Sequence, residues 1–528
     1  MKPELVRDLI RQSGANKPKK TAFVCGSNSV TWGAIDERSS KLVSVFKSLG
    51  IEHGQAVGIL APESIEVYEH FFACFKLGAI RTGINRRFSS REILHILTDA
   101  SIKMILVHAD CLPLLDEIKK EIEEDSILLM GYGGDHKLAL DYDSLLDRAE
   151  TPSELEDHTP ESPVMYTYTS GTTGNPKGVI LSDRALRTVI QNAPSNFGFS
   201  PDDIFYCPLA NSWAAVITNL LGLSNGMTFV IPDGEYETKS FLKTVEEQEI
   251  TTCVLAPTML RWVVDEVEQG SYDISSLRLC MYGSAPATPS LIENVAKTLG
   301  CGLIQGYGTS ESTAGWISSL TPADHERGLS EKPELLQSVG RPPSYFELSI
   351  RDDLGVEVSI GAVGEVWVRS SCIMNGYLNL PEQTAEVLKP GGWLITNDMG
   401  LLDEEGYLYL KDRRKFMIVS GGINVFPAHV EAVVSAHPGV SEIAVVGVPH
   451  PVWGEAVVAV VCLKSGHADI DQSDLLGFCE GKLSKVMMPK HIHFTTEPLP
   501  KSTNLKIQKH LIRKWLLEAD DILPSEFF

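Results

Sequence analysis

Short apolar runs rich in β-branched residues alternate with helical patterns along most of this 528-residue chain. The run at 56–60 precedes a helical pattern at 64–78, and the run at 104–109 precedes a helical pattern dense in Lys and Glu. The same order recurs at 251–257. Parallel strands need a crossover to reach their neighbours, so this alternation predicts parallel sheets with helices on both faces. The chain is therefore expected to be an α/β protein.

Two of the helix starts are marked by capping residues. Ser89 and Glu92 stand at capping-box spacing before a helical pattern. Ser182 is a candidate N-cap for another helix, because a hydroxyl oxygen at this position accepts a hydrogen bond from the first turn.

The sequence changes character after about residue 330, where short strand-like runs are separated by turn residues. Charge density rises at KDRRK (411–415), as expected of an exposed linker, and helix and strand patterns follow it to the end of the chain. The chain is too long for one core. We expect a large N-terminal domain at 1–412, with parallel-rich sheets, flanking helices and the β-rich section. A small α+β domain is expected at 413–528.

Charge and cysteine content argue against several kinds of partner. The net charge of −23 disfavours nucleic acid, because a phosphate backbone binds a basic face. No run reaches the ~20 apolar residues of a membrane-spanning helix. The ten cysteines contain no CxxC pair, and the N-terminus lacks the apolar core of a signal peptide. Free thiols in a reducing compartment, the cytoplasm, are expected.

A stretch rich in glycine and hydroxyl side chains, Thr169 to Gly178, follows a strand candidate at 164–169. Glycines let backbone N–H groups turn toward a ligand, hydroxyls donate to phosphate oxygens, and Lys177 adds a cation. Gly178 follows the lysine, so this is not a Walker A loop, in which Ser or Thr follows. A polyphosphate-binding loop is one interpretation, and a solvated surface turn is the other.

Six motifs occur in a fixed order, and together they identify a family. They are YTSGTTGNPKGV (168–179), GSAP (283–286), GYGTSE (306–311), ITND (395–398), KDRRKFMIVSGGINVFPAHVE (411–431) and PKSTNLKI (500–507). The chain resembles the adenylate-forming superfamily over essentially its whole length, in the acyl-CoA synthetase, or acid–CoA ligase, branch. The resemblance implies a two-step reaction. A carboxylic acid and ATP give an acyl-AMP and pyrophosphate, and the thiol of coenzyme A then takes the acyl group.

The resemblance assigns the ATP phosphates to the glycine-rich loop and to GYGTSE. The implied β- and γ-phosphate ligands are Thr169, Ser170, Gly171, Thr172, Thr173, Gly174 and Lys177. Glu311 is implied to bind Mg²⁺ and Thr309 to contact the α-phosphate. A lone glutamate is more often a surface carboxylate, but Glu311 lies within a six-residue match.

The nucleoside is assigned to three further motifs. Tyr307 is implied to stack on adenine. Other implied contacts of the nucleotide are Gly283, Ser284, Ala285, Pro286, Gly306 and Gly308. Asp398 is implied to accept hydrogen bonds from the ribose hydroxyls, and Arg413 to reach the ribose or a phosphate. Relatives usually have glycine where this chain has Asn397.

The C-terminal domain is implied to move between the two steps. Lys506 is implied to neutralise the acid carboxylate and the α-phosphate during adenylation, although Leu505 replaces the usual glycine before it. Lys415 matches the hinge residue about which relatives rotate this domain. Gly421 and Gly422 are implied to line the tunnel for the pantetheine arm of coenzyme A.

The acid pocket is the least specified part of the site. Many relatives have a histidine where Asn211 stands, and the stretch 207–216 contains no acidic residue to pair with an α-ammonium group. Large side chains that are expected to shorten the pocket are Trp213, Met281, Tyr282 and Trp316. They favour an aromatic, cyclic or medium-chain acid over a long straight chain, although large side chains are more often plain core.

Two other functions stay open at this stage. The enzyme is either an acid–CoA ligase or a stand-alone adenylation enzyme that loads a carrier-protein thiol. The departures at Asn211, Leu505 and His429 also permit a non-catalytic nucleotide-binding relative. The sequence leaves a homodimer open.

Overall fold

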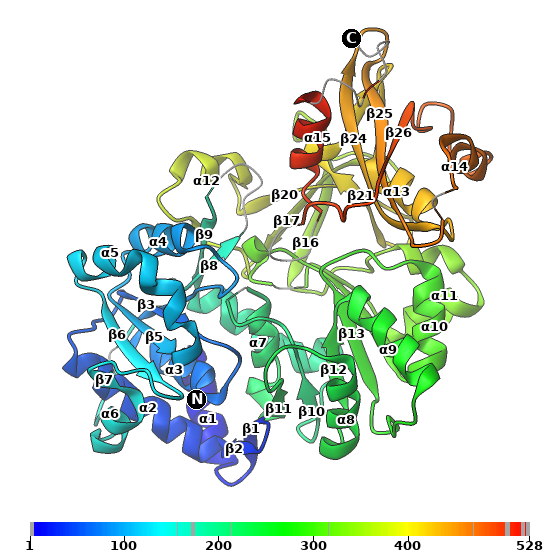
Figure 1. The fold of residues 1–528 in the computed structure, drawn as a ribbon. Coiled ribbons are helices and arrows are strands. Elements are labelled where there is room, and N and C mark those ends of the chain that lie inside the picture. The colour runs from blue at the N-terminus through cyan, green and yellow to red at the C-terminus, as the bar shows by residue number, and fades with distance from the viewer. Residues whose placement is uncertain are drawn as a thin grey trace. The chain divides into compact units, whose positions relative to one another are not determined.

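The computed structural model describes residues 5–155, 157–169, 175–212, 214–314, 316–467, 469–501, 507–518 and 523. The chain divides into two compact units (Figure 1). The first is Met1–Leu348 with Val368–Leu394, and the second is Ser349–Trp367 with Ile395–Phe528. A compact unit need not be the body that rotates, so the boundary at 412/413 and the mobility of the C-terminal domain stay predictions.

The first unit contains two eight-stranded sheets, and the central strands of both are parallel. One sheet has, in spatial order, β18 (Gly376–Tyr377), β9 (Lys177–Ser182), β8 (Pro163–Thr169), β4 (Ile80–Gly83), β3 (Ala56–Leu60), β5 (Met104–His108), β6 (Leu128–Tyr132) and β7 (Leu140–Asp141). The other has β15 (Ser318–Leu320), β14 (Gly302–Tyr307), β13 (Leu279–Gly283), β12 (Thr252–Leu255), β10 (Ile204–Tyr206), β11 (Thr228–Ile231), β1 (Thr21–Cys25) and β2 (Asn28–Thr31). The predicted strand–helix alternation and α/β class are confirmed.

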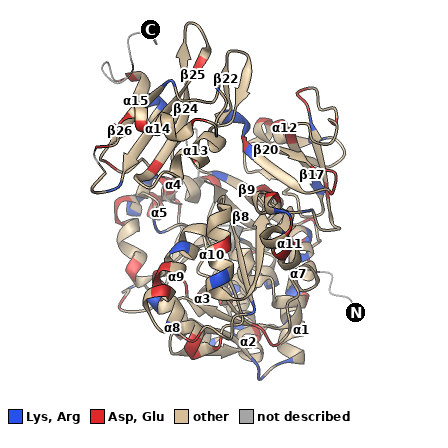
Figure 2. Cartoon of the chain, turned by 90° about the vertical axis from the view of Figure 1, so that its right-hand side faces the viewer, with Lys and Arg blue, Asp and Glu red and all other residues tan. Residues whose placement is uncertain are grey.

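Twelve α-helices of the described part of the first unit connect and cover these strands. They are α1 (Val6–Asn16), α2 (Trp32–Ser48), α3 (Ile65–Leu77), α4 (Ser90–Asp99), α5 (Lys119–Glu124), α6 (Tyr142–Arg148), α7 (Asp183–Phe197), α8 (Thr238–Gln248), α9 (Pro257–Gln269), α10 (Pro289–Leu299), α11 (Pro322–Ser330) and α12 (Pro381–Val387). Apolar residues of α8, α9 and α10 pack on one face of the second sheet. On the solvent side of these three helices, Lys and Arg are interspersed with Asp and Glu (Figure 2).

Helix α3 lies between the two sheets and is buried from Val67 to Leu77. On one side, the Arg81 guanidinium of β4 lies 4.2 Å from the centre of the Phe71 ring. On the other side, Phe23 of β1 stacks on Tyr68 at a centroid distance of 4.5 Å. One helix therefore packs against both sheets of the unit.

The capping predictions are confirmed, and one helix prediction needs correction. The Ser89 hydroxyl accepts from the Glu92 N–H, and the Ser182 hydroxyl accepts from the Ala185 N–H. The helical pattern after β5 forms a 3₁₀ helix at Ala109–Ile118 before α5 begins. Pro113 explains the difference, because proline has no N–H to donate inside an α-helix.

The division between the units passes through three strands of a further sheet. The strands of this sheet are β16 (Phe346–Arg351), β17 (Gly364–Ser370), β19 (Leu388–Lys389), β20 (Trp393–Leu402) and β21 (Leu408–Arg413). Within the second unit, β21 pairs antiparallel with β20 from Asp398 to Leu402.

The second unit also contains an α+β layer structure near its C-terminus. Its sheet consists of β23 (Ile423–Val425), β22 (Ile418–Ser420), β25 (Gly454–Leu463), β24 (Val440–His450) and β26 (His491–Thr495). Its helices are α13 (Pro427–Ser435), α14 (Gln472–Cys479) and α15 (Lys509–Glu518). Val445 packs with α13 and α14, whereas its neighbour Val446 packs with α15 on the opposite face. Successive strand residues point to opposite faces, so helices on both sides explain the apolar runs of β24 and β25.

Within the described ranges, no helix combines the length and the apolar character that a bilayer crossing requires.

Candidate active site

The flanks of the glycine-rich stretch belong to two antiparallel strands. Thr169 ends β8, Lys177 begins β9, and these two residues pair with each other. Five predicted phosphate ligands between them, Ser170, Gly171, Thr172, Thr173 and Gly174, lie outside the described residues. The pairing brings Thr169 and Lys177 together at one edge of the first sheet.

Lys177 and Glu311 are joined through a tyrosine that sequence reasoning missed. The Lys177 ammonium lies 5.2 Å from the centre of the Tyr377 ring. The Tyr377 hydroxyl donates to Glu311 Oε1 at 2.8 Å. Strand β18 places Tyr377 by pairing it with Val179 of β9, beside Lys177. The structure thus gathers two predicted phosphate-site residues that are far apart in the sequence.

Tyr377 carries little signal in the sequence. It lies on a strand of two residues, too short to show an alternating pattern, within MNGYLNLPEQT (374–384). Its backbone N–H donates to the Thr384 hydroxyl of α12 at 2.9 Å. The flanking glycine and the Pro–Glu helix start indicate an ordered turn, but nothing local points to Glu311.

Glu311 lies on a short 3₁₀ turn, Ser310–Ser312, after β14, and Thr309 is the N-cap of this turn. The Thr309 hydroxyl accepts from the Ser312 N–H at 3.2 Å, and the Ser312 hydroxyl accepts from the Thr309 N–H at 3.0 Å. The Met374 N–H donates to the Glu311 carbonyl at 2.9 Å. These bonds fix the backbone that carries both side chains.

The two predicted adenine loops leave neighbouring parallel strands. Gly283 ends β13 and pairs with Gly306 near the end of β14. A Cβ on Gly283 would lie 2.5 Å from the Gly306 carbonyl oxygen, and one on Gly306 would lie 2.2 Å from the Trp316 ring. The strands can therefore approach each other, and Trp316, only with glycine at both positions.

The residues after these strands are accessible to a ligand. Ser284, Ala285, Pro286 and Gly308 are exposed, and Tyr307 is half-buried. Carboxyl ends of neighbouring parallel strands are where open α/β sheets bind ligands.

Tyr282 belongs to a buried hydrogen-bond chain. Its hydroxyl donates to His325 Nε2 at 2.8 Å, and His325 Nδ1–H donates to the Thr321 carbonyl at 2.8 Å. Burial lowers the pKa of His325 to about 4, so the ring is neutral at pH 7. The Tyr282 ring packs in the core formed with α8, α9 and α10. Its predicted role in the acid pocket stays a prediction.

Asn211 is held by two charged residues that sequence reasoning did not select. Its N–H donates to Glu63 Oε1 at 2.5 Å, and its carbonyl accepts from Arg81 Nη2 at 2.6 Å. Its side-chain amide donates to the Ala61 carbonyl at 3.1 Å. Burial raises the pKa of Glu63 to about 7.

The other candidates for the acid pocket are Trp213, Met281 and Trp316. Trp213 lies outside the described residues. Met281 is fully buried, and Trp316 packs edge-on against Phe197 of α7 at 4.8 Å. The signal that could have found Arg81 is its charge within a buried strand pattern.

In the second unit, Asp398 and Arg413 face each other on paired strands. Asp398 Oδ1 lies 3.0 Å from Arg413 Nε, and the Asp398 side chain is buried. The preceding Asn397 has a φ of +61°. Glycine and asparagine tolerate this left-handed conformation best, so asparagine is a physically reasonable replacement for the glycine of relatives.

Three further predicted residues of the second unit lie on turns. Lys415 is exposed within the 3₁₀ turn Arg414–Phe416. Gly421 and Gly422, at φ +58° and +78°, form the two-residue turn between β22 and β23. Two positive φ values define the hairpin turn for which Gly–Gly is suited. Lys506 lies outside the described residues, between Lys501 and Ile507, which form a β-bridge.

Sequence similarity places the chain in a known family. The chain matches the AMP-binding enzyme family over residues 10–378 and the AMP-binding enzyme C-terminal domain over residues 429–506. It therefore belongs to the AMP-binding enzyme family, in the acyl-CoA synthetase branch of the adenylate-forming superfamily. The predicted family is confirmed.

Individual relatives cover nearly the whole chain. An indoleacetate–CoA ligase of Aromatoleum aromaticum is 32% identical over 97% of this chain and 98% of its own length. A fatty acid–[acyl-carrier-protein] ligase of Streptomyces coeruleorubidus is 31% identical over 94% of each. The long-chain-fatty-acid–CoA ligase FadD13 of Mycobacterium tuberculosis is 30% identical over 96% and 97%.

A solved structure shows the same fold. The amide bond synthetase McbA of Marinactinospora thermotolerans aligns with a TM-score of 0.84 at 30% identity, over 96% of this chain and 99% of that one.

The link from Tyr377 to Glu311 gives a first prediction. Tyr377→Phe removes the donor that orients the Glu311 carboxylate. We expect the Mg²⁺ concentration for half-maximal pyrophosphate release to rise about 10-fold or more, the effect of losing one hydrogen bond to a charged group. Tyr272→Phe is the matched control, since the Tyr272 hydroxyl donates to Glu266 at 2.7 Å away from the site. An equal Mg²⁺ requirement in Tyr377→Phe and Tyr272→Phe would contradict the role of Tyr377 in orienting Glu311.

The buried histidine gives a second prediction, on stability. The folded-state pKa of His325 is about 4, below its ordinary 6.5. The contribution of the neutral ring to the free energy of unfolding is therefore complete above pH 6.5 and is lost as the pH falls toward 4. From pH 7.5 to 5.5 the wild-type free energy of unfolding should fall by about 1 kcal/mol more than that of His325→Gln. Urea denaturation at the two pH values measures this. His510→Gln, at an exposed site, should follow the wild type; if His325→Gln does too, the prediction fails.

Proposed function

We propose that this chain is an ATP-dependent, AMP-forming acid–CoA ligase. In the first step, an oxygen of the acid carboxylate attacks the α-phosphorus of ATP. An acyl-AMP forms, and pyrophosphate leaves with the electron pair of the broken P–O bond. In the second step, the thiol sulfur of coenzyme A attacks the acyl carbon, the thiol loses its proton, and AMP leaves. The observation that carries the proposal is the grouping of Lys177, Tyr377 and Glu311 beside the glycine-rich loop.

The first step brings two anions together, so the site must supply positive charge. We assign the β- and γ-phosphates to the stretch from Thr169 to Lys177 and the α-phosphate to Thr309. Lys177 lies at the base of the loop, where its ammonium can neutralise the leaving pyrophosphate. Tyr377 supports this arrangement, because its ring contacts the Lys177 ammonium and its hydroxyl holds Glu311.

The residues present fit a magnesium ion that ATP brings with it. Across the described ranges, no group of three or more His, Cys, Asp or Glu side chains could form an all-protein metal cage. Mg²⁺ on a nucleotide uses phosphate oxygens and water with one or two carboxylates, and Glu311 supplies one carboxylate. The ion would supply charge neutralisation at the phosphates.

The nucleoside roles follow the same reasoning. We assign the adenine to Tyr307 and to the exposed residues Ser284, Ala285 and Pro286. Asp398 suits the two ribose hydroxyls, because an ionised carboxylate accepts two hydrogen bonds. Arg413, whose Nε lies 3.0 Å from Asp398 Oδ1, can itself reach ribose or phosphate oxygens.

The C-terminal part of the chain is assigned to the change between steps. We propose that Lys506 neutralises the carboxylate and α-phosphate during adenylation, and that rotation about Lys415 then admits coenzyme A. Gly421 and Gly422 would lie beside the pantetheine arm. The Gly–Gly turn supports this, because it leaves bare backbone exposed.

For the substrate, we propose an aromatic, cyclic or medium-chain acid. The indoleacetate–CoA ligase supports an aromatic acid, and the lack of an acidic residue at 207–216 disfavours α-amino acids. The fatty acid–[acyl-carrier-protein] ligase keeps a carrier-protein thiol as the second candidate acceptor. A cytoplasmic location is proposed, since all ten cysteines are free thiols.

The deciding experiment is pyrophosphate release from ATP and Mg²⁺ with a panel of carboxylic acids, each with and without coenzyme A. Release with one class of acid, followed by CoA-dependent thioester formation, is expected. Release without use of coenzyme A would favour the carrier-protein acceptor. ATP binding without release for any acid would favour a non-catalytic relative.

A third prediction concerns Lys506. Lys506→Ala should slow pyrophosphate release about 100-fold or more, because a charge directed at the developing transition state is lost. Thioester formation from supplied acyl-AMP and coenzyme A should change much less. Lys514→Ala, an exposed lysine on α15, is the control. Equal losses in the two half-reactions would refute the role of Lys506.

A further inference from the structure

Helix α4 lies beside β8 and β9, the strands on either side of the glycine-rich stretch, in both views of the chain (Figures 1 and 2). Two of its polar residues, His95 and Asp99, are one helical turn apart and therefore share a face. Both are half-buried, and the apolar residues Ile93, Ile96 and Leu97 on α4 are fully buried in the core. Helix α4 is thus fixed by its buried apolar residues, and the polar side chains of His95 and Asp99 are directed at neighbouring segments.

His95 holds the chain immediately before Lys177. Its Nε2–H donates to the Pro176 carbonyl at 3.0 Å, and its Nδ1 accepts from the Asn175 side-chain amide at 3.4 Å. The carbonyl can only accept and the amide N–H can only donate, so both bonds require one neutral tautomer, with the proton on Nε2. The imidazole therefore forms hydrogen bonds with two successive residues, Asn175 and Pro176.

Asp99 holds the other flank. Its Oδ2 accepts from the Tyr168 hydroxyl at 2.7 Å, one residue before Thr169. Its Oδ1 and its backbone carbonyl each accept from the Asn379 side-chain amide at 3.0 Å. Asn379 follows Tyr377 by two residues, so Asp99 also ties the segment that orients Glu311.

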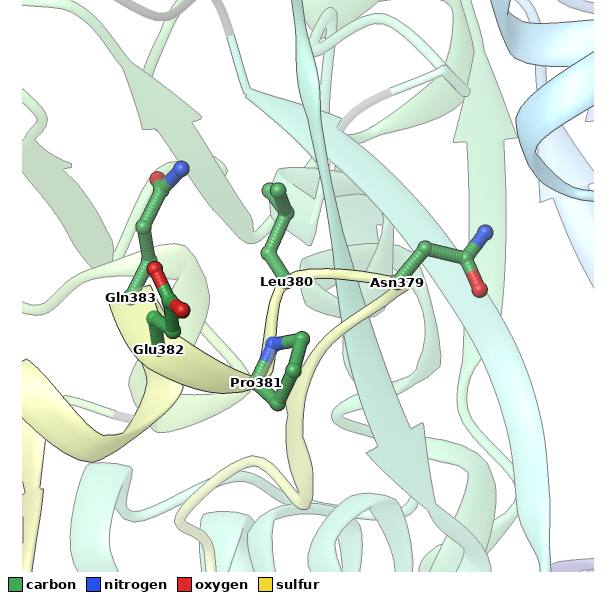
Figure 3. Close-up of a pocket in the computed structure, with 5 residues that line it drawn as sticks. All are labelled: Asn379, Leu380, Pro381, Glu382 and Gln383. Atoms are coloured by element: carbon green, nitrogen blue, oxygen red, sulfur yellow. The ribbon is translucent and has the colours of Figure 1, made fainter.

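The turn that begins at Asn379 determines the direction of the Asn379 side chain. Residues Asn379 to Gln383 line a hollow of about 230 Å³, and the Asn379 side chain points away from the rest of the turn (Figure 3). The amide therefore meets α4 instead of its own turn.

We propose that His95 and Asp99 form a brace, the α4 brace, which fixes the flanks of the glycine-rich stretch, at Tyr168 and at Asn175–Pro176, together with the Tyr377 segment, for binding of the β- and γ-phosphates of ATP. Glycine-rich backbone loses more conformational entropy on ordering than any other. Its affinity for a polyphosphate therefore depends on how much of the bound conformation is already fixed before the ligand binds. The brace holds both ends of the loop and the Glu311 partner from one rigid helix. The inference rests on the proposed role of the loop as a phosphate site, but not on catalysis.

The test compares ATP with AMP, which lacks the two phosphates. With Mg²⁺ present, calorimetry gives the dissociation constants of both nucleotides. His95→Ala should weaken ATP binding about 10-fold, the effect of two lost hydrogen bonds, and change AMP binding less than 2-fold. His95→Gln should restore most of the ATP affinity, because the glutamine amide offers both a donor and an acceptor. Thr98→Ala, exposed on the same helix, is the control and should match the wild type.

Tyr168→Phe tests the other end of the brace by removing only the hydroxyl that Asp99 accepts. It should also weaken ATP more than AMP, which keeps the proposal falsifiable if His95→Ala does not fold. Equal weakening of ATP and AMP, or no change in either variant, would overturn the brace. A wild type that binds ATP tightly but releases no pyrophosphate would refute the ligase function and leave this comparison intact.

Discussion

The burial of α3 between two eight-stranded sheets is the constraint on which the first unit depends. A helix that is buried at every position from Val67 to Leu77 must be covered on all sides, so neither sheet can separate from it without exposing large aromatic residues to water. The Phe23–Tyr68 stack and the Arg81–Phe71 contact show that both sheets use the same helix. The strand edges that carry the site residues are therefore held at fixed separations by the core behind them.

Next to this rigid core, short strand pairings at the edge of the first sheet bring the predicted phosphate-site residues together. The antiparallel return of β9 beside β8 places Lys177 against Thr169, and β18 adds Tyr377 to the same edge. Tyr377 then connects that edge to Glu311, which comes from the end of the other sheet. A helix from outside the sheet, α4, holds the connecting backbone. Elements from distant parts of the sequence, β18 and α4, thus contact the two flanks of the glycine-rich stretch.

Much of this could be read from the sequence, and the failures have physical causes. Strands such as β3 and β5 and helices such as α3 were predictable, since burial imposes apolar patterns of the matching period. Ser89 and Ser182 were predictable because capping is a local interaction. The 3₁₀ helix at Ala109–Ile118 was missed, because Pro113 interrupts an otherwise helical pattern. Tyr377, His95 and Asp99 were not selected, since each acts through contacts far away in sequence and none has a distinctive local pattern. Arg81 and Glu63 escaped for the same reason.

The route of the chain through its two units has a consequence for biosynthesis. Residues 349–367 belong to the second unit, but residues 368–394, including Tyr377, belong to the first. During translation the segment 349–367 leaves the ribosome before most of its own unit exists, while the first unit can be completed by residue 394. The second unit must therefore wait for the C-terminal quarter of the chain, and cutting the gene at any single point would leave at least one unit incomplete.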